Sequence, residues 1–105
     1  MTSNAVFRAL ADETRRDILR MLRGGPRTSG EIADHFDSSW PTISRHLSVL
    51  RDAGLVTTER KGQEIHYELN TSVFEDVVQY LMGWVKPGLD KGRPRSRRAP
   101  RGQEV

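Results

Sequence analysis

The sequence has 105 residues, about the length of one domain, and a formal net charge of +3. It contains no cysteine, which excludes disulfides, thiolate nucleophiles and metal sites built on sulfur. The N-terminal residues show no basic region followed by an apolar run, and no stretch reaches the roughly 18 apolar residues of a membrane span. We therefore expect a cytoplasmic protein without signal peptide or membrane anchor.

The positive charge is concentrated at the C-terminal end. From residue 86 onward there are seven basic residues and two acidic ones, whereas residues 1–85 carry ten basic and twelve acidic groups. Nucleic-acid contact by the folded part must therefore depend on a local basic patch. We predict a domain over residues 1–88 and a disordered basic tail over residues 89–105. Two interpretations of the tail are open: an arm that strengthens nucleic-acid binding through counterion release, and a solvated segment that aids solubility.

Two helices are predicted in the N-terminal part. Thr2 or Ser3 caps a short first helix. Asp12 is a good N-cap for a second helix that runs to about Arg23, where Gly24-Gly25-Pro26 ends it.

Two further helices are predicted between residues 28 and 54. Thr28-Ser29-Gly30-Glu31 has the pattern of a capping box and opens a short helix that reaches about Phe36. After the turn Asp37-Ser38-Ser39, where Ser38 or Ser39 provides the cap, the next helix runs from about Trp40 to Ala53. Its apolar residues recur at i, i+4 and i+7 and form one stripe: Ile43, Leu47 and Leu50.

After Gly54 the period of the pattern changes from 3.6 to 2. Residues 56–60 and 65–69 are predicted strands joined by Lys61-Gly62-Gln63. A last helix, capped by Asn70 or Thr71, is expected to extend to about Val85. The fold class is mainly α with a two-stranded β-wing: a winged helix-turn-helix in the order α-α-α-α-β-β-α.

This fold predicts a DNA-reading surface. In a helix-turn-helix, one helix braces a second helix, whose N-terminal half enters the major groove. The segment 29–36 is the predicted bracing helix and 40–53 the reading helix. Their polar side and leading end give the predicted DNA contacts Ser38, Ser39, Trp40, Thr42, Ser44, Arg45, His46 and Ser48.

Arg45 is the main candidate for base reading, because arginine pairs bidentately with guanine. The alternative is a solvated arginine paired with Asp52 or Glu31. His46 contacts a phosphate or is a half-buried structural histidine, and Trp40 packs on the turn or lies against the DNA backbone. The hairpin tip adds Arg60, Lys61 and Gln63 as predicted backbone or minor-groove contacts, although a charged tip is also simply soluble.

The last helix has an apolar face wider than the roughly 100° that a core requires. We interpret the surplus as a dimer interface, in preference to a helix wrapped inside its own domain. With the first helix, the predicted interface consists of Val6, Phe7, Leu10, Val73, Phe74, Val77, Val78, Leu81, Met82 and Trp84.

Two segments, Ala9–Leu19 and Pro41–Val56, resemble the ArsR/SmtB-type repressors. The end of the hairpin, Ile65–Asn70, is similar to the SdpR-like autorepressor branch of that family. The resemblance covers about residues 6–85. It implies a homodimer, formed through the first and last helices, that binds double-stranded DNA at a promoter inverted repeat and blocks transcription.

Metal sensing, which the best-known members of this family perform, is not expected here. The thiolate pair of those members has no counterpart, and residues 71–85 offer only Glu75 and Asp76, which diverge by about 100° around a helix. The three histidines, His35, His46 and His66, lie on separate elements. We predict no metal and no cofactor, and the sequence identifies no small-molecule effector.

The predicted function is a sequence-specific transcriptional regulator, most simply a dimeric repressor and, following the resemblance, an autorepressor. The alternative is a winged-helix module for protein–protein interaction that lacks DNA readout. An enzyme is not expected, because Ser44 and His46 point in different directions on one helix and no phosphate-binding loop is present.

Overall fold

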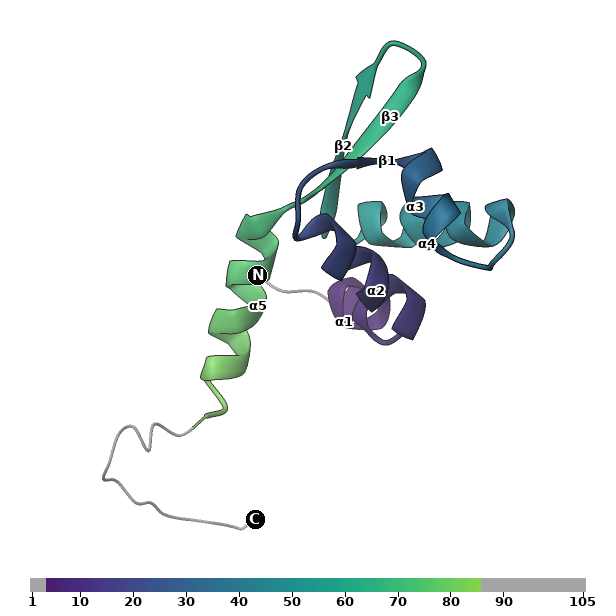
Figure 1. Ribbon diagram of the computed structural model, residues 1–105. Helices are drawn as coiled ribbons and strands as arrows, with labels where there is room; N and C mark the ends of the chain where they lie inside the picture. The colour runs from purple at the N-terminus through teal and green to yellow at the C-terminus, as the bar shows by residue number, and fades with distance from the viewer. Residues whose placement is uncertain (1–3, 86–105) are drawn as a thin grey trace, which may run out of the picture.

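The computed structural model describes residues 4–85. The predicted caps Thr2 and Ser3 and the predicted tail over 89–105 lie outside the described residues. The fold is the expected winged helix-turn-helix, with one strand more than predicted (Figure 1). Its elements in chain order are α1 (Asn4–Leu10), α2 (Glu13–Leu22), β1 (Arg27–Thr28), α3 (Ser29–His35), α4 (Trp40–Asp52), β2 (Val56–Lys61), β3 (Glu64–Leu69) and α5 (Thr71–Met82).

Side-chain caps start three of the helices where the sequence predicts them. The Asp12 carboxylate accepts from the backbone N–H of Arg15 at 3.0 Å and begins α2. Both bonds of the capping box at α3 are present: Thr28 N–H donates to the Glu31 carboxylate and Glu31 N–H donates to the Thr28 hydroxyl. Ser39, and not Ser38, caps α4. Each cap satisfies an amide that has no partner inside the helix.

The sheet has three antiparallel strands in the order β1-β3-β2. The two-residue β1 pairs with β3, Arg27 opposite Tyr67 and Thr28 opposite His66. A strand of two residues carries no periodic signal, so sequence reasoning missed it. Its pairing joins the base of the wing to the residue that caps α3.

The core lies between α2, α3, α4 and the base of the wing, and α1 and α5 add Val6, Ala9 and Val77 to it. The apolar stripe predicted on α4 is buried, and so are Ile18 of α2 and Ile32 of α3. Leu55 and Tyr67 extend this core into the wing. Burial of one face of α4 leaves its opposite face to the solvent.

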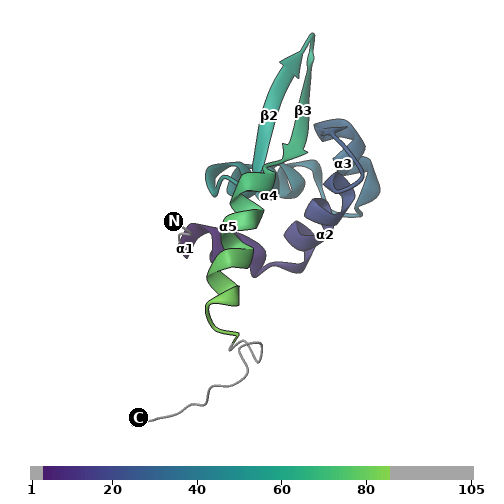
Figure 2. The same ribbon diagram turned by 90° about the vertical axis from the view of Figure 1, so that its left-hand side faces the viewer.

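The last helix begins differently from the prediction. Asn70 occupies the N-cap position of α5 but makes no side-chain cap bond. Its amide nitrogen donates instead to the carbonyl of Gly54 at 3.0 Å, so the side chain ties the start of α5 to the end of α4. Gly54 has φ +82°, a conformation that favours glycine. The helix ends at Met82, before the expected Val85, and runs away from the wing along one side of the helical body (Figure 2).

Candidate nucleic-acid interface

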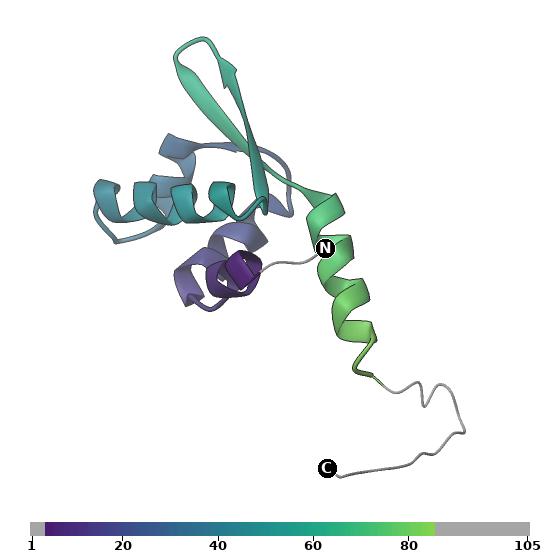
Figure 3. The ribbon, with the colours of Figure 1, turned by 180° about the vertical axis from the view of Figure 1, so that it is seen from behind.

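The helix-turn-helix consists of α3, the turn over residues 36–39, and α4. Figure 3 shows α4 crossing the surface of the molecule, with its N-terminal end farthest from α5 and the wing projecting above it. Ile43, Leu47 and Leu50 are at most 2% exposed and attach α4 to the core. The helix is therefore held by one face only.

The opposite face of α4 is polar and accessible over its first two turns. Ser44 and Arg45 are exposed, while Thr42 and Ser48 are half-buried. At the leading end Ser38, Ser39 and Trp40 are also exposed, Trp40 by 52%. The Ser39 hydroxyl lies 2.9 Å from the Thr42 hydroxyl and is engaged in the helix cap.

Arg45 has no intramolecular partner among residues 4–85: no hydrogen bond or ion pair of its side chain occurs there. Its two predicted partners are engaged elsewhere. Glu31 belongs to the capping box of α3, and Asp52 lies 3.7 Å from the guanidinium of Arg51. The guanidinium of Arg45 therefore keeps all its donors available to an external ligand.

His46, although predicted as a DNA contact, is turned toward α2. Its side chain is only 15% exposed, and its Nδ1 lies 3.2 Å from Arg15 Nη1 and 3.9 Å from the Asp12 carboxylate. The structure thus places it as the half-buried structural histidine of the alternative interpretation. His46 therefore packs the reading helix α4 against α2 and is not part of the polar face of α4.

Arg15 joins three helices at this point. Its Nε donates to the carbonyl of Ala9 at 2.8 Å and its Nη2 to the carbonyl of Arg8 at 3.0 Å, so Arg15 satisfies the C-terminal end of α1. The same side chain reaches His46 on α4. The N–H of Arg15 lowers the pKa of Asp12, and the charges of His46 and Arg15 act in the same direction. Sequence reasoning missed the contacts of Arg15 with α1 and with His46, because these residues meet only in the tertiary structure.

The wing is longer and less cationic at its tip than the sequence indicates. The ladder continues to Lys61 opposite Glu64, which leaves a two-residue turn over Gly62 and Gln63 in place of the predicted three-residue loop. Gly62 has φ +65°. Arg60, Lys61 and Gln63 are exposed, but so are the acidic Glu59 and Glu64, and these offset the two positive charges.

A second accessible surface lies on α5 and is apolar. We call the exposed apolar residues of α5 and of the turn after it the α5 patch: Val78, Tyr80, Leu81, Met82, Trp84 and Val85, each 39–71% exposed. Tyr80, which sequence reasoning missed, packs at a tilt against Phe7 of α1 and edge-to-face against Trp84, with ring centroids 5.5 and 5.4 Å apart.

The other predicted interface residues are less accessible. Val6 and Val77 are 3% and 6% exposed and belong to the core of the single chain. Leu10, Val73 and Phe74 pack against that core and are partly buried. Of the predicted interface residues, those that are exposed are Val78, Leu81, Met82 and Trp84.

Within residues 4–85, no three His, Cys, Asp or Glu side chains are close enough together to hold a metal ion. None of the helices in that part of the chain combines the length and apolar character needed to cross a membrane.

The braced helix, its polar outer face and the adjacent wing define a winged helix-turn-helix DNA-binding protein. Residues 12–58 match the family model "Bacterial regulatory protein, arsR family". The transcriptional repressor SdpR of Bacillus subtilis (strain 168) is 46% identical over 85 residues, which cover 81% of this chain and 94% of that protein. The arsenical resistance operon repressor of Staphylococcus aureus is 35% identical over 78 residues, 74% of this chain and 75% of that protein.

The structure of the chain is also similar to solved structures of ArsR family regulators. The crystal structure of an ArsR family transcriptional regulator superimposes with a TM-score of 0.72 and 34% identity, covering 77% of this chain and 84% of the other. The chain belongs to the ArsR family of bacterial regulatory proteins. It is a DNA-binding transcriptional regulator without cysteine, and the family is not enzymatic.

Proposed function

We propose that this protein is a dimeric repressor that binds an inverted repeat in a promoter and reads it with α4. The observation that carries the proposal is the free guanidinium of Arg45 on the accessible face of a helix whose other face is buried. A guanidinium placed in this way suits the bidentate recognition of guanine O6 and N7 in the major groove. Ser44, Thr42 and Ser48 are short enough to let the helix approach the bases and phosphates.

The dimer is proposed from the α5 patch. A chain of this size rarely leaves several large apolar side chains exposed on one helix unless a partner covers them. The two-fold pairing of two α5 helices would place one reading helix on each side of the dimer axis, which suits an inverted repeat. The similarity to the repressor SdpR favours repression, and we propose that the protein acts in the cytoplasm on the promoter of its own gene.

The contribution of the wing is proposed to be small. Arg60, Lys61 and Gln63 would lie near the DNA backbone beside the reading helix. Glu59 and Glu64, exposed at the same tip, reduce the attraction to phosphate.

The test is a comparison of Arg45→Ala with Arg51→Ala. Both arginines are exposed on α4, but Arg51 lies in its last turn beside Asp52. DNA fragments from upstream of the gene are selected with the wild-type protein, and operator and random duplex are then titrated with each variant. We expect Arg45→Ala to reduce operator affinity about 5- to 150-fold, with less effect on random duplex. Arg51→Ala should change neither affinity by more than about twofold.

Arg45→Lys separates charge from geometry in the same assay. It keeps the positive charge but loses the bidentate fork, so it should retain binding to random duplex and lose preference for the operator. Equal operator affinity of wild type, Arg45→Ala and Arg45→Lys would refute the proposed reading face. Failure of the wild type to bind any duplex at low salt would favour the alternative interaction module.

A further inference from the structure

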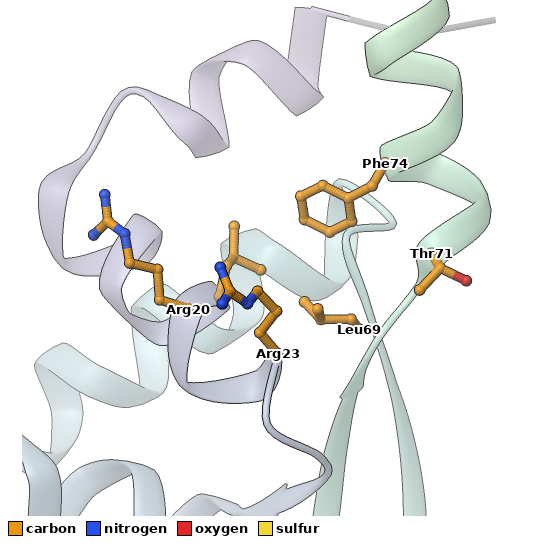
Figure 4. Close-up of a pocket in the computed structure, with 6 residues that line it drawn as sticks. Arg20, Arg23, Leu69, Thr71 and Phe74 are labelled. Atoms are coloured by element: carbon orange, nitrogen blue, oxygen red, sulfur yellow. The ribbon is translucent and has the colours of Figure 1, made fainter.

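A pocket opens between α2, the end of β3 and the start of α5 (Figure 4). Its volume is about 340 Å³ and its lining residues are Leu19, Arg20, Arg23, Leu69, Thr71 and Phe74. This volume is within the range of sites that bind small molecules. Figure 4 shows Phe74 and Leu69 directed into the space between α2 and α5, while the Thr71 hydroxyl points away from it.

The walls of the pocket are apolar. Leu19 is 6% exposed, and Leu69 and Phe74 pack against the core with their remaining surface toward the pocket. Leu19 on α2, Leu69 at the end of β3 and Phe74 on α5 line the pocket from its different sides. An apolar surface that faces a gap of this size lacks dispersion contacts, so an apolar ligand of matching shape is favoured there.

Two arginines line the pocket with mainly apolar parts of their side chains, and the guanidinium of one of them is available at its edge. Arg20 forms an ion pair with Asp17 on the same helix. The side chain of Arg23 has no hydrogen bond or ion pair with any residue in the described range 4–85, and Figure 4 shows its guanidinium beside the apolar walls. No acidic residue lines the pocket. The complementary ligand therefore carries one negative charge next to an apolar body.

We propose that this pocket binds an amphiphilic monocarboxylate. The apolar body packs between Leu69 and Phe74, and the carboxylate pairs with Arg23. Such a ligand contacts α2, the base of the wing and α5 together. Binding is therefore coupled to the angle at which α5 leaves the core, and through it to operator binding; this coupling, unlike the site itself, rests on the proposed function.

The test is a titration of the full chain with decanoate below its micellar concentration, followed by calorimetry and by the NMR signals of Leu69 and Leu81. Two probes of the same chain length, 1-decanol and decyltrimethylammonium, separate charge from apolar contact. We expect one saturable decanoate site per chain, weaker binding of decanol, and the weakest binding for the cation. The signal of Leu69 should shift at low decanoate concentration and by more than that of Leu81 on the α5 patch.

Arg23→Gln removes the cation, and its exposed position leaves the fold intact. It should lower decanoate affinity about tenfold and leave decanol affinity unchanged. Arg51→Gln, an exposed arginine on α4, is the matched control and should bind decanoate as the wild type does. At saturating decanoate, the operator affinity of the wild type should change at least threefold.

Unchanged decanoate affinity in Arg23→Gln would overturn the proposal. So would a shift of Leu81 without a shift of Leu69, which would locate the fatty acid on the α5 patch. Binding of decanoate only at dilutions that dissociate the dimer would also overturn it, because a second copy of the chain would then cover the pocket. The titration contains no DNA, so its outcome is independent of the Arg45 test of the proposed function.

Discussion

The helices α4 and α5 have similar lengths, 13 and 12 residues, and both are amphipathic, yet the chain uses them in opposite ways. The apolar stripe of α4 is completely buried and its accessible face is polar. In α5 only Val77 is buried, and the accessible face carries Val78, Leu81 and Met82. Apart from Trp40 at its first position, the large apolar side chains of α4 are covered within one chain, whereas most of those of α5 are not.

The difference indicates two kinds of partner. A polar helix face with an uncommitted arginine suits a charged, hydrogen-bonding ligand such as DNA. An exposed apolar patch that contains Tyr80 and Trp84 suits a protein surface, because aromatic residues are enriched at the centres of protein interfaces. The predictions below test this division, beginning with the largest expected effect.

The first prediction compares the same change on the two helices. Leu47→Ala on α4 should lower the free energy of unfolding by about 2–5 kcal/mol, because it leaves a cavity in the core. Leu81→Ala on α5 should change it by no more than about 0.5 kcal/mol at dilutions that favour the monomer, since Leu81 is 39% exposed. Urea denaturation measures both values. Equal losses would mean that α5 is packed inside the monomer.

The second prediction concerns the two tryptophans, both exposed in the single chain. Trp84→Ala should raise the dissociation constant of the dimer at least about thirtyfold, since a buried tryptophan in an interface contributes about 2 kcal/mol or more. Trp40→Ala, at the leading end of α4, should leave the dimer unchanged. Sedimentation equilibrium gives both constants. A dimer that tolerates Trp84→Ala but dissociates with Trp40→Ala would reverse the roles assigned to the two helices.

The third prediction concerns the Asp12–Arg15–His46 junction that holds α4 against α2. Asp12→Ala should lower the free energy of unfolding by about 1 kcal/mol at neutral pH, because it removes the N-cap of α2. Asp12→Asn keeps the N-cap and should lower the free energy of unfolding by less than Asp12→Ala does.

The effect of Asp12 should depend on pH with a defined sign. Its pKa in the folded state lies below the ordinary value of 3.8, so its ionised form stabilises the fold above that value, and the stabilisation is lost as pH falls through the folded pKa. The difference between wild type and Asp12→Ala should therefore shrink below pH 3.8 in urea titrations. Asp76→Ala, an exposed position on α5, is the control; a difference that grows on acidification would contradict the assignment.

The smallest effect is expected at the tip of the wing. Lys61→Ala should weaken operator and random duplex alike, by less than tenfold, and reduce the slope of log affinity against log salt by about 1. Glu64→Gln, on the residue opposite Lys61, should strengthen both. A loss of preference for the operator in Lys61→Ala would show that the wing reads bases.

Much of the fold was predictable because it depends on local signals. Asp12, the Thr28–Glu31 box and Gly54 mark helix ends through hydrogen bonds and backbone angles that involve neighbouring residues. The stripe on α4 was predictable because its spacing of four and three residues matches the helical period. The errors occurred where distant residues compete: Asn70 bonds to Gly54 instead of capping α5, and the short β1 exists only because β3 lies beside it.

The candidate site likewise contains residues that local spacing could place and residues that only distant contacts place. Arg45 could be placed on the polar face from periodicity, but its neighbour His46 could not be placed, because its contact with Arg15 joins positions 31 residues apart. The exposure of Tyr80 likewise depends on the positions of other elements, whereas the acidic neighbours of Lys61 are already close to it in the sequence.

By itself, therefore, the sequence determined the order of the helices and the two wing strands, the buried stripe of the reading helix and the family, since these depend on short-range spacing and residue type. The tertiary structure alone decided which face of α5 stays uncovered, where the long side chains of Arg15 and Arg23 end, and that a pocket remains between α2 and α5. These features depend on the angles between elements, which result from packing over the whole chain rather than from any local pattern.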